Sequence, residues 1–396
     1  TLGLGGGADG LVLTVNSEPD GIGELNGTVR SDEPVVWTEP TTLKRAFERG
    51  RVKGKVRINL PDLQFVARLV TQVRHLEGAA QVDLELGGPL RSPEVVGTTT
   101  VSGVSATLGG LPPLQELAGT LRFTPGRLEF APIKGEIGYE PFELTGTVEL
   151  SESGAPILDV ALKGANLLLV RQRHLRVRAD LDVTATGPLD ALSAAGVVTI
   201  TDGLYSQPID IFAGGGARVA DTSMQFFSVR SGPMANARLD IKLLGDESFR
   251  IRNNFVRGSI SFDLALKGTG KVPEPRGSIF LQESLVALPA TSLKIVQGEI
   301  RFPPDNPFAP SVEMAGRTRM RGFDLDLRVS GVAPELQVFL SSSPSLSQED
   351  AYVLITTGGL PADYENEAGQ RAALARAGSF VGKQFLSRLA GPSDPD

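Results

Sequence analysis

The sequence has 396 residues, of which 41% are hydrophobic and 21% are charged, and its formal net charge is −7. This acidic balance excludes a general nucleic-acid binder, because such a protein needs a basic face that replaces counterions. The chain has no cysteine, and its two histidines, His75 and His174, stand alone, so we expect no disulfide framework, no metal site and no cofactor.

The first residues predict a strand and a turn rather than a targeting segment or a nucleotide site. Thr1 to Leu4 lack the charged region and the cleavage site of a signal peptide, so any targeting signal or anchor is expected upstream of this chain. The glycines of residues 5–10 match a dinucleotide-binding fingerprint, but that fingerprint needs a helix to follow. Residues 11–15 (LVLTV) are typical of a strand, so we expect a flexible turn here and also at residues 214–216.

A seven-residue pattern, apolar-Asp-apolar-x-apolar-x-Gly, recurs six times along the chain. The copies are residues 82–88, 158–164, 181–187, 239–245, 262–268 and 325–331. Alternation with a period of two predicts a strand with one apolar face and one mostly polar face. The closing glycine allows the chain to turn.

Three copies continue into a proline-bearing loop in which a second glycine follows nine residues after the first. These loops are 88–97, 187–196 and 268–277, and a new strand is expected to start after each, at residues 98, 197 and 278. The six aspartates are separated by 76, 23, 58, 23 and 63 residues, whereas a solenoid would show one period. We therefore predict an all-β protein with a meandering antiparallel sheet. The apolar face can be hidden in a sandwich or can line a trough.

Two segments outside the repeat have helical features. Residues 63–76 (LQFVARLVTQVRHL) fit either a short helix or a long strand. Ser347 to Asp350 form a capping box ahead of residues 351–357, and Gly358 is placed to end that helix.

The last part of the chain has a different composition. Residues 367–389 are rich in alanine and arginine, with apolar residues three or four apart, which predicts an amphipathic helix. Its basic side chains fit either an anionic membrane surface or, as the interpretation we favour, the solvent side of a helix packed on the sheet. The expected domains are a β-groove scaffold (1–340), a capping-box helix and turn (341–361), and an amphipathic helix with a disordered tail (362–396).

The chain shows no arrangement that is typical of a catalytic site. The pair Asp324 and Asp326 is compatible with calcium or with glycosidase chemistry, but each repeat supplies a single aspartate rather than a cluster of oxygen ligands. Two isolated histidines give little support to a serine triad. We therefore expect no catalytic residues, no enzyme activity, and aspartates that lie on the solvated face of the sheet.

Several motifs occur in a characteristic order between residues 50 and 390. They are residues 54–63 (GKVRINLPDL), residues 76–78 (LEG), the loop 88–97, residues 298–302 (GEIRF) with Asn306, Pro307 and Pro310, and residues 343–350 (SPSLSQED) with Leu354 and Gly358. This order resembles the C-terminal region of TamB, the inner-membrane subunit of the translocation and assembly module in the AsmA-like group. The last motif is the most specific.

The resemblance implies an elongated, curled antiparallel sheet that forms an open groove with an apolar interior, followed by short C-terminal helices. About 30 strands at roughly 4.8 Å would extend on the order of 140 Å. The parent protein would be anchored in the inner membrane by an N-terminal segment that this chain lacks, and would cross the periplasm of a Gram-negative-type envelope. Its partners would be phospholipid, a TamA-like outer-membrane β-barrel of the Omp85 type, and outer-membrane protein or autotransporter clients. It would move phospholipid towards the outer membrane and support outer-membrane protein assembly.

In such a groove, the apolar residues of the repeats would face acyl chains. These residues are Leu84, Leu86, Val160, Leu162, Leu181, Val183, Ile241, Leu243, Phe262, Leu264, Leu266, Leu325 and Leu327. Two alternatives remain open. One is a chaperone-like assembly factor that templates client strands at a sheet edge, and the other is a passive structural β-rod with a self-filled core.

Overall fold

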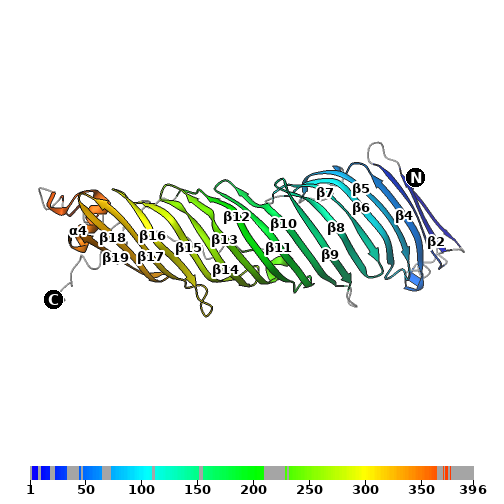
Figure 1. The fold of residues 1–396 in the computed structure, drawn as a ribbon. Helices are drawn as coiled ribbons and strands as arrows, with labels where there is room; N and C mark the ends of the chain where they lie inside the picture. Colours follow the sequence, from blue (N-terminus) through cyan, green and yellow to red (C-terminus); the bar gives the residue numbers. More distant parts are fainter. Residues whose placement is uncertain are drawn as a thin grey trace. The chain divides into compact units, whose positions relative to one another are not determined.

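The structure, a computed structural model, describes residues 2–7, 10–17, 23–33, 44–45, 48–64, 73–108, 112–150, 155–208, 228–229 and 232–363, and also residues 369, 371, 372 and 375. These residues form nineteen strands assigned to one sheet, with few short helices (Figure 1). Every strand pairing that is resolved is antiparallel, which confirms the predicted all-β class. The strands are 6 to 17 residues long, so they are fewer and longer than the 30 short strands expected.

Two compact units divide the chain. The first holds residues 1–171, 178–198 and 236–238. Its strands are β1 (Leu2–Gly7), β2 (Gly10–Ser17), β3 (Glu24–Ser31), β4 (Val52–Leu60), β5 (Val73–Gly87), β6 (Glu94–Leu108), β7 (Leu114–Thr124), β8 (Arg127–Ile137), β9 (Glu140–Leu150) and most of β10 (Pro156–Gln172) and β11 (Leu175–Pro188). From β1 to β10, each strand pairs with the next along the chain.

The second unit holds residues 172–177, 199–235 and 239–396. The boundary falls within β12 (Ser193–Tyr205). The elements that follow are α3 (Pro233–Asn236), β13 (Arg238–Arg252), β14 (Val256–Gly268), β15 (Pro273–Ala287), β16 (Ser292–Phe302), β17 (Ser311–Met320), β18 (Phe323–Val332), β19 (Glu335–Ser343), α4 (Gln348–Thr357) and the 3₁₀ turn η1 (Pro361–Asp363). From β13 to β19, each strand again pairs with its successor.

Tight hairpins explain why successive strands pair. Gly138 and Tyr139 join β8 to β9 with φ angles of 64° and 69°, and Arg321 and Gly322 join β17 to β18 with φ angles of 50° and 85°. Two residues with positive φ are the signature of a turn whose twist matches that of the strands beside it. The chain therefore reverses in two residues and forms the ladder with its own continuation.

The strands after the proline-bearing loops begin earlier than predicted, at Glu94, Ser193 and Pro273. In the third loop, Pro273 and Pro275 lie within β15, opposite Gly268 and Leu266 of β14. Proline cannot donate to a ladder, but β15 pairs with β16 only from Gly277 onward. The two prolines therefore lie where β15 has a described partner on one side only, a position that tolerates them.

Close backbone contacts recur beside the repeats. At Gly97 of β6, a Cβ atom would lie 2.1 Å from the carbonyl oxygen of Asp83, and φ is +144°. At Gly277 of β15, the matching distance to the Asp263 oxygen is 2.2 Å and φ is +115°. Gly146 and Gly196 make the same contact with Asp159 and Asp182. Only glycine fits where another backbone comes so close.

The helix α4 confirms the predicted caps. The Ser347 hydroxyl accepts a hydrogen bond from the Asp350 backbone N–H at 3.0 Å, and Gly358, at φ 82°, donates its N–H to the Leu354 carbonyl. In the ambiguous segment, Val73 to Leu76 are strand, whereas residues 65–72 lie outside the described residues. The glycines 214–216 and most of the expected helix 367–389 and tail also lie outside them.

Candidate functional site

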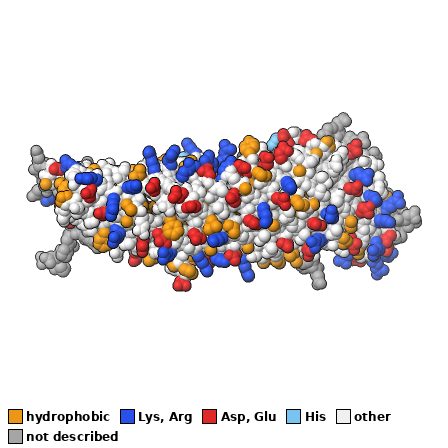
Figure 2. All heavy atoms as spheres, in the orientation of Figure 1, with side chains coloured by type: hydrophobic (Ala, Val, Ile, Leu, Met, Phe, Trp, Pro, Cys, Tyr) orange, Lys and Arg blue, Asp and Glu red, His pale blue; other side chains and the backbone are white. Residues whose placement is uncertain are grey.

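The repeat aspartates share the exposed face of the sheet. All six (Asp83, Asp159, Asp182, Asp240, Asp263 and Asp326) are exposed. Several face a cation on a neighbouring strand: Arg57 lies 3.3 Å from Asp83, Lys163 3.2 Å from Asp182 and Arg317 2.6 Å from Asp326. Figure 2 shows charges of both signs interspersed over the visible face. Exposed pairs of this kind contribute about 0–1 kcal/mol each, so they mark a solvated face rather than a reactive site.

The apolar residues of the repeats alternate with these charges and lie on the opposite face. In the first unit, the six candidates are Leu84, Leu86, Val160, Leu162, Leu181 and Val183, and all are half-buried. The ladder places Leu84 opposite Val56 and Leu162 opposite Leu144. The first unit therefore presents an apolar sheet face whose side chains keep part of their surface in contact with solvent.

In the second unit, the candidates are more deeply covered. Leu243, Leu264 and Leu266 are buried, with Leu264 only 2% exposed, whereas Ile241 and Phe262 are half-buried. The register sets Ile241 opposite Leu266 and Leu243 opposite Leu264. The structure thus brings these four together in one apolar patch across β13 and β14.

The last two candidates lie beneath the chain's own helix. Leu325 is 1% exposed and belongs to a cluster with Val353 and Leu354 of α4, and Leu327 packs against that cluster. The Tyr352 hydroxyl donates a hydrogen bond to the Val338 carbonyl of β19 at 3.1 Å, which fixes α4 over the end strands. In this arrangement Leu325 is covered within the cluster that holds α4, and Leu327 lies at the edge of that cluster.

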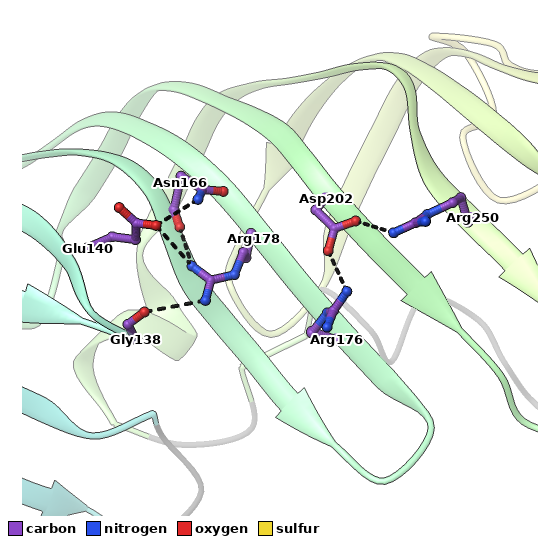
Figure 3. Close-up of polar contacts among 7 residues, drawn as sticks. All are labelled: Gly138, Glu140, Asn166, Arg176, Arg178, Asp202 and Arg250. Atoms are coloured by element: carbon purple, nitrogen blue, oxygen red, sulfur yellow. Dashed lines mark hydrogen bonds and ion pairs between the residues drawn. The ribbon is translucent and has the colours of Figure 1, made fainter.

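A polar cluster in the first unit holds an irregular piece of backbone (Figure 3). The Arg178 guanidinium donates to the carbonyl oxygens of Asn166, at 2.9 Å, and Gly138, at 3.3 Å. It also lies 3.6 Å from Glu140, which accepts a hydrogen bond from the Asn166 amide at 2.9 Å. Asn166 has φ 54°, so its conformation is one that a side-chain network has to support. The cluster has donors and acceptors that satisfy one another, which is the pattern of a structural clamp.

In the second unit, Asp202 of β12 lies between two arginines. Its carboxylate accepts from Arg176 at 2.8 Å and from Arg250 at 2.5 Å, and its side chain is 27% exposed (Figure 3). Two guanidinium groups neutralise the one carboxylate. This arrangement links the strands that carry the three residues.

The remaining sequence candidates do not gather into a site. Asp324 and Asp326 each pair with a separate arginine, Arg319 at 3.6 Å and Arg317 at 2.6 Å. His75 lies 3.1 Å from Glu77 of its own strand. Across the part of the chain that the structure describes, no three His, Cys, Asp or Glu residues are grouped as metal ligands. No helix among the described residues has the length and apolarity to cross a membrane.

Sequence reasoning missed both arginine clusters. Arg178 and Gly138 are 40 residues apart, and Arg250 and Asp202 are 48 apart. Such contacts depend on the register between distant strands, so no local spacing signals them. The glycine contacts did have a signal, because Gly97, Gly196 and Gly277 are the second glycines of the three repeated loops.

Comparison with known proteins identifies the family. The family model of the TamB C-terminal domain matches residues 133–392, which is more than half of the chain. No curated protein and no solved structure matches this chain. The matched family is a non-enzymatic family that acts in transport and assembly, with a role in outer-membrane biogenesis. Membership in this family implies a periplasmic location and TamA-like partners. On the evidence of this match and of the antiparallel sheet, the chain belongs to the TamB C-terminal domain family.

Proposed function

We propose that this chain shields phospholipid acyl chains along the apolar face of its sheet while they move towards the outer membrane. The observation that carries the proposal is the half-burial of the apolar repeat residues in the first unit, beside an opposite face covered with ion pairs. A stable apolar face of this kind needs a cover. The alkyl chain of a lipid provides one, at about 0.8 kcal/mol for each CH₂ removed from water.

The proposed contact residues are those of the sequence prediction, with one refinement. Leu325 and Leu327 belong to or pack against the cluster that holds α4, so acyl contact is assigned to the other eleven residues. In the proposed arrangement, the parent protein is anchored in the inner membrane and this region extends through the periplasm. It meets a TamA-like barrel of the Omp85 type and also supports the assembly of outer-membrane or autotransporter proteins.

The test uses two neighbouring positions on β11 that face opposite sides. Val183 is half-buried on the apolar face, and Thr184 is exposed on the other. Val183→Asp should remove co-purifying phospholipid and slow lipid transfer between vesicles, because a carboxylate on the apolar face repels alkyl chains. Thr184→Asp adds the same charge in the same strand and should leave both unchanged. Leu264→Asp is a poorer test, because at 2% exposure this change risks unfolding the second unit.

Native mass spectrometry with lipid extraction, after expression in a bacterial periplasm, measures the bound lipid. Stoichiometric phospholipid that is lost in Val183→Asp and kept in Thr184→Asp supports the proposal. A lipid-free chain, or equal lipid in the two variants, contradicts it. In that case, a strand-templating assembly factor predicts that charges on the terminal strands abolish activity, and a passive rod predicts that neither set of changes does.

A further inference from the structure

A strongly basic segment stands out in this acidic chain. Residues 44–57 hold seven lysines and arginines and one glutamate, although the whole chain carries a net charge of −7. Arg51, which precedes β4, and Lys53, Lys55 and Arg57 of β4 are all exposed, and they alternate with less exposed residues such as the buried Val52. Figure 2 shows Lys and Arg side chains gathered in the region where Figure 1 labels β2 and β4. Residues 51–57 therefore display their cations on one face.

Elsewhere on this face, cations are matched by carboxylates across the ladder. Lys55 pairs with Glu85, and Arg57 pairs with Asp83 at 3.3 Å. Lys53, the next exposed cation of β4 before Lys55, has no such carboxylate opposite it. The register sets it directly opposite another cation, Arg30 of β3. Like charges directly opposite one another destabilise a ladder. Among the described residues, no carboxylate lies within ion-pair distance of either side chain.

The other neighbour of Lys53 leaves room for a ligand. The register that pairs Gly54 with Leu86, and Arg51 with Pro89, sets Lys53 opposite Gly87. A Cβ atom at Gly87 would meet nothing within 4 Å, so the space beside the lysine is open.

This space is part of a cleft of about 1240 Å³, which we call the cationic cleft. Arg30, Arg51 and Lys53 line it, as do the two salt-bridged pairs and the acidic residues Asp32 and Glu94. The Asp32 carboxylate already accepts the Arg51 backbone N–H at 2.6 Å. Arg45 and Arg49, which precede β4, are exposed and also have no ion pair among the described residues. Three cations without an ion pair among the described residues thus line the cationic cleft, and two more precede β4 along the chain.

We propose that the cationic cleft docks this end of the chain on a membrane surface that contains anionic phospholipid. A phosphate group between Arg30 and Lys53 relieves their repulsion, and Arg45, Arg49 and Arg51 add attraction to the surface. Groups of four to eight Lys and Arg side chains are what such surfaces bind. The cations come from two strands and from the residues before β4, which fits an extended charged surface better than one small anion. The inference concerns the charged face and is independent of the proposed acyl contact on the apolar face.

Vesicle co-sedimentation of the full chain tests this inference. Phosphatidylcholine vesicles, with and without about 30% phosphatidylglycerol, are compared at low and at physiological salt. Wild-type chain should bind the anionic vesicles only, and less so at higher salt. The double variant Arg30→Gln/Lys53→Gln should lose roughly 10- to 30-fold in affinity. The control Arg127→Gln/Arg317→Gln removes the same charge from two matched pairs, with Glu149 and Asp326, and should lose less than about twofold.

Equal losses in the two double variants would overturn the proposal, because binding would then follow net charge alone. Binding to neutral vesicles that matches binding to anionic ones would overturn it too. Release by millimolar inorganic phosphate, but not by chloride of the same ionic strength, would assign the cleft to a free phosphate instead. Val183→Asp should still bind anionic vesicles, so failure of the acyl-shielding function and failure of this inference give different results.

Discussion

Replacing Gly97 with alanine should destabilise the pairing of β5 and β6 by about 2–6 kcal/mol. Two costs add. The backbone φ of +144° is one that L-residues rarely adopt, which costs on the order of 1–3 kcal/mol. The new methyl group would also lie 2.1 Å from the Asp83 carbonyl oxygen. This oxygen is backbone and cannot rotate away, so the strands must shift, at an overpacking cost of about 1–3 kcal/mol.

Gly87 provides a matched control in the same pair of strands. An alanine there meets nothing within 4 Å, and its φ lies outside the left-handed region, so Gly87→Ala should change stability by less than about 0.5 kcal/mol. Urea titration followed by far-UV circular dichroism gives the overall effect. Hydrogen exchange of the β5 and β6 amides localises it, which matters because a chain of two units need not unfold in one step. If Gly97→Ala and Gly87→Ala have the same midpoint and the same exchange rates, the close contact does not have the energetic role inferred from it.

Two further predictions concern the second unit. Leu354→Ala should cost about 2–5 kcal/mol, because this α4 side chain is fully buried among Val353, Leu325 and Leu340; thermal unfolding and exchange of the α4 amides measure it. Glu299 should link stability to pH, because hydrogen bonds from Arg301 and then Ser278 hold its pKa below the ordinary value of 4.5. A carboxyl with a depressed pKa stabilises the fold fully above its unfolded pKa and loses that contribution as the pH falls through its folded pKa. Glu299→Gln should therefore be less stable than wild type at pH 7, and this difference should shrink below pH 4.5, as urea midpoints across the pH range will show.

The strands and α4 could be predicted because their signals are local. A period of two needs only adjacent residues to alternate, and the caps of α4 need only Ser347 before the helix and Gly358 after it. The antiparallel order of the strands could be predicted from the unequal intervals between the repeat aspartates, because hairpins of different length give such intervals whereas a solenoid gives one period. Strand starts were less accurate: the ladder of β5 and β6 continues to the pair Gly87 and Glu94, whereas the sequence predicts a start after the second glycine of the loop, at residue 98.

The depth to which each apolar side chain is buried could not be predicted from the sequence. Leu84 and Leu264 occupy the same place in their repeats, yet Leu84 is half-buried and Leu264 is 2% exposed. Alternation assigns both to the apolar face, but the depth of burial depends on the segments that pack there. The Arg178 cluster was unpredictable for a related reason, since its partners come from the turn before β9, from β9 and from β10, and they meet only in the folded sheet.

The glycine contacts give the repeat spacing a physical meaning. The register sets the second glycine opposite the residue after the aspartate, as Gly97 is opposite Leu84 and Gly277 is opposite Leu264, so these two residues lie 13 positions apart in both repeats. At Val160 the facing glycine, Gly146, precedes the repeat, so no forward spacing reveals it. In each case, an apolar side chain faces a neighbour that has none. A side chain at Gly97 or Gly146 would collide with the backbone of the neighbouring strand, so the pairing of these strands requires glycine at both positions.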